Sequence, residues 1–224
     1  MPRLVLPLVW ILLAAAHTHA APPSPKETFH QAESQCSRGD PDACALLGVH
    51  YQNGKGIAKD QEQAVKLFKE SCEKGSQIGC TDLAAVYVSA PPSPQSIDRA
   101  SALYTQACNA GVGRACSGLA YLLKAQSKTA SQRVLSLARR GCKLKNGWGC
   151  YLVGTQFLEK KGKEKEARSE YELSCKFGHG PGCILLGQLH VSGVGGSSNP
   201  KRGAELFYRA CELGQPKGCG HLAR

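Results

Sequence analysis

Cysteine is the residue of this sequence whose spacing most clearly indicates chemistry. Twelve cysteines fall into six pairs, and the two members of each pair are eight positions apart. The pairs are Cys36 with Cys44, Cys72 with Cys80, Cys108 with Cys116, Cys142 with Cys150, Cys175 with Cys183, and Cys211 with Cys219. On one continuous helix the Cα atoms of such a pair would be about 12 Å apart, beyond the roughly 7 Å that a disulfide allows. A disulfide within a pair therefore requires the chain to reverse between its cysteines.

Metal binding is the alternative chemistry for so many cysteines. Structural zinc sites use C-x2-C pairs or mixed clusters of cysteine and histidine, and the sequence has no such cysteine spacing. Beyond residue 20, the histidines form no H-E-x-x-H or H-x-H element. We therefore expect no metal site and no cofactor. An even number of cysteines without a leftover thiol favours a disulfide framework instead.

Serine chemistry is the remaining catalytic possibility. An S-x-x-K motif places a nucleophile and a lysine base on one helical face, and the sequence has it at Ser71 with Lys74 and at Ser198 with Lys201. Neither copy is accompanied by an S-D-N or K-T-G element, and the nearest stretch, 128–130, reads K-T-A. Ser71 and Lys74 are thus catalytic candidates only if the protein is a serine hydrolase.

The residues between the paired cysteines predict a turn. Five of the six cassettes have glycine three positions after the first cysteine, where a left-handed residue would end a helix. These glycines are Gly39, Gly75, Gly111, Gly178 and Gly214. Each cassette is therefore expected to be a helix end, a turn and a helix start. In the remaining cassette Lys145 takes the glycine position, and we expect Asn146 or Gly147 to supply the positive φ in a slightly different turn.

The cassettes belong to a longer repeat. Successive first cysteines are 36, 36, 34, 33 and 36 residues apart, a period typical of solenoids built from helical hairpins. Large apolar residues stand three positions after the second cysteine, and small residues stand four positions after it. The large ones are Leu47, Leu83, Leu119, Val153, Leu186 and Leu222, and the small ones are Gly48, Ala84, Ala120, Gly154, Gly187 and Ala223. A small residue lets a neighbouring helix approach closely, so this face should pack into the core.

Two segments, Ala43 to Cys80 and Gly182 to Cys219, carry an LG-x2-Y-like pattern and a glycine-containing loop. They resemble Sel1-like repeats, which are relatives of tetratricopeptide repeats. The paired cysteines are also similar to those of the secreted cysteine-rich branch, the Helicobacter cysteine-rich protein type. The resemblance implies an all-α solenoid of about five helix-turn-helix repeats after an N-terminal half-repeat, with one disulfide closing each repeat.

The start of the chain predicts export. Residues 1–20 contain one positive charge at Arg3, an apolar run from Leu4 to Ala16 and a small-residue cleavage site ending at Ala20, as in a secretory signal peptide. The apolar run is too short to span a membrane. An exported protein would meet the oxidising conditions that disulfides need, in the periplasm or outside the cell. The expected organisation is a linker at 21–25, a half-repeat at 26–41, repeats at about 42–78, 79–113, 114–148, 149–181 and 182–218, and a partial repeat at 219–224.

Function follows from the resemblance less directly, because repeats specify a shape and side chains choose the ligand. The resemblance implies a scaffold that binds proteins or peptides, and we expect a monomer. It also implies an alternative, which is weak penicillin binding or β-lactam hydrolysis.

Charge gives the only indication of the partner. The formal net charge is +11, and basic residues gather in the third and fourth hairpins. They are Arg139, Arg140, Lys143, Lys145, Lys160, Lys161 and Lys163. One interpretation is a solvated face that keeps the protein soluble; the other is a binding site for an acidic protein or an anionic envelope polymer. Nucleic acid is not an expected partner of an exported protein.

Overall fold

The computed structural model describes residues 23–91, 93–126 and 132–222 of the chain. Within these residues it contains helices joined by short connections and no strand. The helices are α1 (Pro25–Ser37), α2 (Pro41–Asn53), α3 (Gln61–Glu73), α4 (Gln77–Ser89), α5 (Pro94–Asn109), α6 (Gly113–Gln126), α7 (Gln132–Lys143), α8 (Gly147–Leu158), α9 (Glu164–Lys176), α10 (Gly180–Ser192), α11 (Pro200–Glu212) and α12 (Pro216–Leu222). The predicted signal peptide lies outside the described residues. No described helix has both the length and the apolar character needed to cross a membrane.

Side-chain caps fix where several helices begin. The Ser24 hydroxyl accepts the backbone N–H of Glu27, whose carboxylate accepts the backbone N–H of Ser24 in return. Asp60 caps α3 and Asn199 caps α11 through their side chains. Because the capping pair at Ser24 starts α1 at Pro25, the last residue of the expected linker belongs to the first helix.

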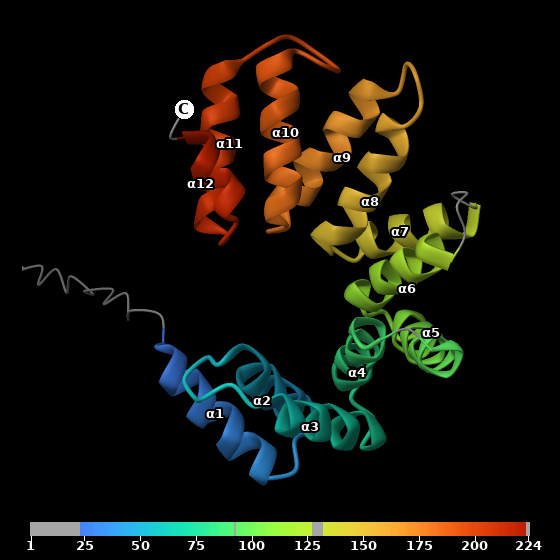
Figure 1. The fold of residues 1–224 in the computed structure, drawn as a ribbon, viewed down its shortest axis with the longest axis vertical. Helices are drawn as coiled ribbons and strands as arrows, with labels where there is room; N and C mark the ends of the chain where they lie inside the picture. Colours follow the sequence, from blue (N-terminus) through green and yellow to red (C-terminus); the bar gives the residue numbers. More distant parts are fainter. Residues whose placement is uncertain (1–22, 92, 127–131, 223–224) are drawn as a thin grey trace, which may run out of the picture.

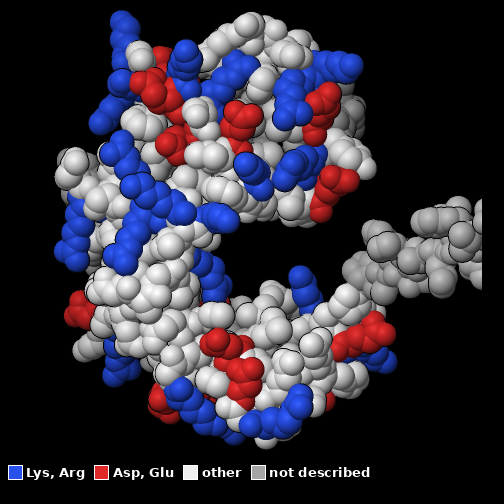
Figure 2. Space-filling view, turned by 180° about the vertical axis from the view of Figure 1, so that it is seen from behind, with Lys and Arg blue, Asp and Glu red and all other residues white. Residues whose placement is uncertain are grey.

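The helices form a two-layered array of hairpins. Each even-numbered helix from α2 to α10 packs against the odd-numbered helix that follows it. Even-numbered helices also contact the next even-numbered helix, from α2 through to α12. Successive helices lie closer on the inside of a bend, so the even-numbered layer is the concave one. The array curves into an arc whose N-terminal and C-terminal hairpins face each other across an opening (Figure 1), which is hollow in the space-filling view (Figure 2).

The core lies between neighbouring helices, as the apolar and small positions predict. In three hairpins the aromatic ring of the odd-numbered helix lies against a glycine of the even-numbered helix. A Cβ atom at Gly48 would lie 2.6 Å from the Phe68 ring, and one at Gly154 would lie 2.8 Å from the Tyr171 ring. Phe68 and Tyr171 are fully buried. The predicted all-α solenoid is therefore confirmed.

Each cassette is closed by its own disulfide, with Cα atoms 4.5 to 4.8 Å apart. Such a short separation requires small residues beside the cysteines. In the second cassette a Cβ at Gly79 would lie 2.3 Å from the Ser71 hydroxyl oxygen, so the helices could not approach with a larger residue there. The described chain contains no free cysteine.

The turn at Lys145 corrects the sequence-based expectation. Lys145 itself has a φ of 60°, whereas Asn146 has a φ of −86° and caps α8, and Gly147 is the first residue of that helix. The Lys145 N–H donates to the carbonyl of Cys142 at 2.9 Å, as the Gly75 N–H donates to the carbonyl of Cys72. The turn is the same as in the other cassettes, because the disulfide and the two helices hold lysine in the left-handed region.

Replacing Lys145 with glycine is therefore expected to stabilise the protein. A left-handed conformation costs a residue with a Cβ roughly 1–2 kcal/mol, and glycine adopts it at no steric cost. We expect Lys145→Gly to raise the free energy of unfolding by about 1 kcal/mol in urea titrations. The matched control is Lys74→Gly, because Lys74 also follows a helix but has a φ of −83°. Equal effects of both substitutions would contradict this account.

Candidate functional site

The concave face is formed by one side of each even-numbered helix. In α4 this side carries Ile78, Asp82 and Ala85, which share a helix face by their spacing. The equivalent residues are Asp42, Leu46 and Val49 in α2, Arg114, Gly118 and Tyr121 in α6, and Trp148, Leu152 and Thr155 in α8. Most of them line two hollows, and Arg114 lines both.

The first hollow, here called the aromatic hollow, has a volume of about 270 Å³. Its wall contains the aromatic rings of Tyr104, Tyr121 and Trp148. Arg114 and the smaller side chains of α4 complete the wall. The centroids of the Tyr121 and Trp148 rings are 5.4 Å apart, and Tyr121 is 47% exposed. Concave pockets with aromatic walls and a few polar groups are the usual form of ligand sites.

Tyr104 reaches this hollow because of two neighbouring small residues. Its counterparts Phe68 and Tyr171 lie on a glycine of their own hairpin, but Tyr104 meets Ala84 at that position. The Tyr104 ring instead lies against Gly118 of the next hairpin, where a Cβ would be 2.7 Å away. Burial raises the pKa of Tyr104 to about 12, although the charge of Arg114 opposes this. The phenol therefore stays neutral beside Arg114.

The second hollow, here called the acidic hollow, has a volume of about 610 Å³ and lies between α2, α4 and the start of α6. Asp40, Asp42 and Asp82 line it together with apolar residues such as Leu46 and Ile78. Asp40 caps α2 by accepting the backbone N–H groups of Asp42 and Ala43. These contacts hold the Asp40 carboxylate in place at the rim, and the Ser76 hydroxyl donates to Oδ1 of Asp42.

Asp82 and Arg114 form an ion pair where the two hollows meet. The Asp82 side chain is only 5% exposed, whereas that of Arg114 is 45% exposed. Arg114 binds Oδ1 of Asp82, and Oδ2 is buried without a hydrogen-bond partner. Burial raises the pKa of Asp82, and the charge of Arg114 opposes the rise. A buried carboxylate with one unsatisfied oxygen is costly in a structural role, and this favours a role in binding.

The sequence contains a signal for this pair that the core pattern does not use. Two positions after the second cysteine, Asp82 stands where three of the other five repeats have leucine, at Leu46, Leu152 and Leu185. A carboxylate at a position where leucine is the commonest residue indicates a local function. Its pairing with Arg114 depends on how closely α4 and α6 approach, which only the curvature of the array determines.

Three of the seven predicted basic residues lie together at one hollow. Arg139, Lys143 and Lys145 line a separate hollow of about 460 Å³ beside Leu173 and Phe177 of the α9 region. Arg140 instead donates to the carbonyl of Asn109 at 3.3 Å. Lys and Arg are common over the C-terminal half in Figure 2.

The other three predicted basic residues lie in the connection between α8 and α9. They are Lys160, Lys161 and Lys163. Lys163 forms an ion pair with Glu166 at 2.5 Å, while Arg139 lies 5.7 Å from the centre of the Phe157 ring. Binding of an acidic partner by the seven basic residues stays a prediction.

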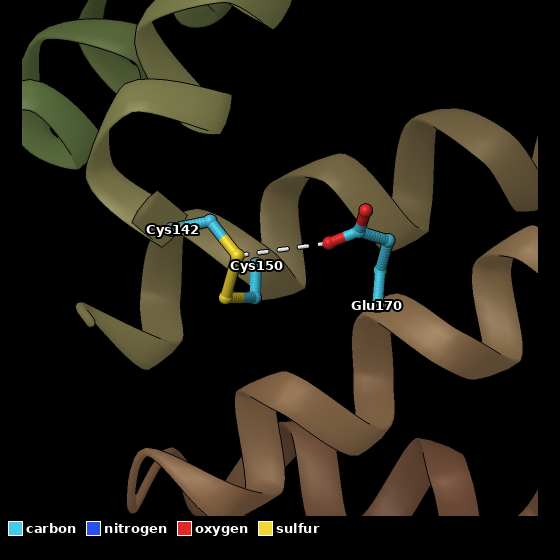
Figure 3. A group of neighbouring side chains, drawn as sticks. All are labelled: Cys142, Cys150 and Glu170. Atoms are coloured by element: carbon cyan, nitrogen blue, oxygen red, sulfur yellow. Dashed lines mark hydrogen bonds between the residues drawn. A yellow bond between two sulfur atoms is a disulfide. The ribbon is translucent and has the colours of Figure 1, made fainter. Parts of the chain in front are cut away.

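A cluster of Cys142, Cys150 and Glu170 also lies in this region (Figure 3). Cys142 Sγ is 3.6 Å from Oε2 of Glu170. The two cysteines are joined by a disulfide, so neither sulfur is the thiolate that binds metals. A disulfide sulfur has no proton, so a hydrogen bond here requires the protonated carboxyl. Burial raises the pKa of Glu170, and the charge of Arg139 opposes this rise.

The geometry at Ser71 does not support a serine nucleophile. Ser71 is completely buried between helices, and its hydroxyl donates to the carbonyl of Pro41 at 2.6 Å. Lys74 is the C-cap residue that follows α3. In the second motif, the Ser198 hydroxyl donates to the carbonyl of Val191 at 2.8 Å. Ser71 is out of reach of a substrate, and the Ser198 hydroxyl is directed to a backbone carbonyl, so the β-lactamase alternative gains no support from these residues.

A known family of repeats matches the sequence at segments that coincide with helical hairpins. The model of the Sel1 repeat matches residues 41–76, 79–112 and 180–215. These matches fall on the hairpins α2–α3, α4–α5 and α10–α11. These three hairpins are Sel1 repeats. No curated protein matches the sequence.

Solved structures show the same Sel1 fold. A Sel1 repeat protein from Oxalobacter formigenes aligns with a TM-score of 0.62 and 17% identity, over 90% of this chain and 87% of the other. A protective antigen of uropathogenic Escherichia coli aligns with a TM-score of 0.54 and 20% identity, over 91% of this chain. This chain spans only 44% of that antigen. At these identities the likeness concerns the fold alone.

Helicobacter pylori cysteine rich protein B is 27% identical over 57% of this chain and 96% of its own, with a TM-score of 0.48. The disulfides themselves are typical of an oxidising, extracytoplasmic compartment, because thiols in the cytosol are kept reduced.

Proposed function

We propose that this protein is a binding scaffold that holds a segment of a partner protein against its concave face. The observation that carries the proposal is the pair of hollows that meet at Arg114. Tryptophan, tyrosine and arginine dominate the energetics of protein interfaces, and the aromatic hollow presents all three. The disulfides that join each hairpin to the next support the proposal too, because a surface that is already ordered loses little conformational freedom on binding.

The direction of the hollows favours an extended segment. They lie across α2, α4, α6 and α8, and neighbouring packed helices are about 8–10 Å apart. At about 3.3 Å per extended residue, a segment of about 8 residues crosses all four helices. Its side chains would alternate between the hollows and solvent.

Selection of peptides tests this function directly. A random library of twelve-residue peptides is selected on the oxidised full chain, and the dissociation constants of enriched peptides are measured by calorimetry. We expect the double substitution Tyr121→Ala with Trp148→Ala to weaken binding at least tenfold, because the aromatic side chains supply the buried contact area.

The matched control is Tyr208→Ala, because Tyr208 is 57% exposed on α11, a helix of the outer layer. It should change the dissociation constant less than twofold. If enriched peptides bind the double variant as tightly as the wild type, the concave face is not the binding site.

We further propose that residues 1–20 direct export and are then removed. The composition of that segment and the six disulfides support this proposal. Mass spectrometry of the protein recovered from its producing cells tests it: a chain beginning near Ala21 is expected, and a chain that retains Arg3 would contradict it.

A further inference from the structure

We infer that the acidic hollow is a subsite for a positively charged side chain, lysine or arginine, of the bound segment. The inference rests on the proposed function and adds the chemistry of its ligand. In this arrangement Asp82 accepts a hydrogen bond from the cationic group, and an apolar or aromatic side chain nearby in the segment occupies the aromatic hollow.

The charge balance of the acidic hollow favours a cation. Asp40, Asp42 and Asp82 contribute three carboxylates, and Arg114 contributes the only cationic group of its lining. Within the described residues, neither Asp40 nor Asp42 forms an ion pair. The hollow therefore has an excess of negative charge, in a chain whose formal net charge is +11. Such a local field attracts a basic group and repels an acidic one.

The unsatisfied oxygen of Asp82 provides the specific acceptor. A carboxylate can accept several hydrogen bonds, but only Oδ1 of Asp82 has a donor, and Oδ2 is buried without one. The donor at Oδ1 belongs to Arg114, whose side chain is 45% exposed and can rotate toward solvent. A ligand ammonium or guanidinium group at this carboxylate would complete its hydrogen bonds.

The position of Arg114 links the two subsites. It lines the aromatic hollow as well as the acidic one, so the subsites are neighbours on α6. One apolar wall of the acidic hollow is made by Leu46 and Ile78, which are 47% and 43% exposed. Exposed aliphatic groups of this kind cover the methylene stem of a lysine or arginine while its charged end reaches the carboxylates.

The experiment uses the peptides selected on the full chain. We expect them to contain a lysine or arginine within a few residues of an aromatic or large aliphatic residue. Replacing that basic residue with norleucine, which keeps the stem and removes the charge, should weaken binding about tenfold. The same replacement should weaken binding to the Asp82→Asn variant by no more than about threefold, because only the rim carboxylates of Asp40 and Asp42 then attract the charge.

Two further variants keep the test independent of folding. Asp40→Asn with Asp42→Asn removes two charges from the rim, and asparagine caps a helix as well as aspartate does. This variant should also weaken binding of the basic peptide severalfold. Asp98→Asn, an exposed residue of α5 in the outer layer, is the control and should change nothing.

The outcomes separate the two proposals. Peptides that depend on Tyr121 and Trp148 but lack a basic residue, or whose basic residue is insensitive to Asp82→Asn, would overturn this inference and leave the proposed function intact. Failure to select any peptide that depends on the concave face would overturn both.

Discussion

Removal of the central disulfide by Cys108→Ala with Cys116→Ala is expected to lower the free energy of unfolding by about 3 kcal/mol. Closing a nine-residue ring is worth about 2.6 kcal/mol in the chain-entropy model. Both cysteines are almost completely buried in the core, so the smaller alanine side chains also leave unfilled space. The effect should be large, because stability in a repeat array depends on each interface between neighbours.

Position in the array supplies the matched comparison. Cys211→Ala with Cys219→Ala removes a ring of the same size, but Cys219 is exposed and belongs to the seven-residue helix α12. That helix packs mainly on α11, with a smaller contact to α10. We expect removal of this disulfide to let α12 detach from the array and to lower the global free energy of unfolding by less than about 1 kcal/mol.

Urea unfolding followed by circular dichroism measures both effects, and peptide binding adds a second measurement. The central disulfide lies between α5 and α6, which both contribute to the aromatic hollow, so its removal should also weaken binding. Equal losses of stability from the two pairs of substitutions would show that the disulfides act without regard to their place in the array.

The cassettes explain why so much of the fold could be predicted. A fixed cysteine spacing with a glycine in between allows few backbone paths, and the repeat multiplies the same constraint. The failure at Lys145 is informative for that reason. Local preference places a positive φ on asparagine or glycine, but the disulfide and the two helices impose the shared turn and override the preference of lysine.

The candidate site was harder to predict because it is formed between repeats. Positions that point to the core follow the helical period within one hairpin, and the sequence displays them. Asp82 and Arg114 belong to different hairpins, and Tyr104 reaches the concave face only because Gly118 of the next hairpin makes room for it. The sequence pattern does not specify the angle between successive hairpins, so it could not bring these residues together.

Substitution of Arg114 by alanine is expected to lower the free energy of unfolding by about 2 kcal/mol at neutral pH. Removing one partner of a fully buried ion pair costs about 3–5 kcal/mol. The cost should be smaller here because Arg114 is half exposed and because Asp82 can take up a proton. Arg99→Ala, at an exposed position of α5 in the outer layer, is the control and should cost less than about 0.5 kcal/mol.

The pH dependence of this loss identifies its cause. Burial raises the pKa of Asp82, and the charge of Arg114 opposes this rise. The pKa of Asp82 should therefore be higher in Arg114→Ala than in the wild type. A folded state whose carboxyl has a raised pKa binds more protons than the unfolded state, and its stability therefore increases as the pH falls. This gain in stability accumulates as the pH falls from the raised pKa of the folded state to the ordinary aspartate pKa of about 3.9. We expect the difference between Arg114→Ala and the wild type to shrink steadily over that range.

A companion variant separates stability from binding. Asp82→Leu with Arg114→Ile installs the residue types that other repeats have at these positions, since Leu46 and Ile78 are their equivalents. Replacing a buried ion pair with apolar residues is often neutral or stabilising by about 1–4 kcal/mol. We therefore expect this variant to be at least as stable as the wild type. Its free energy of unfolding should also lack the pH dependence that titration of Asp82 causes. If it also lost affinity for basic peptides, the charged pair would be retained for recognition at a cost in stability. A variant that is less stable than Arg114→Ala at every pH would show instead that the ion pair is needed for the packing of α4 on α6.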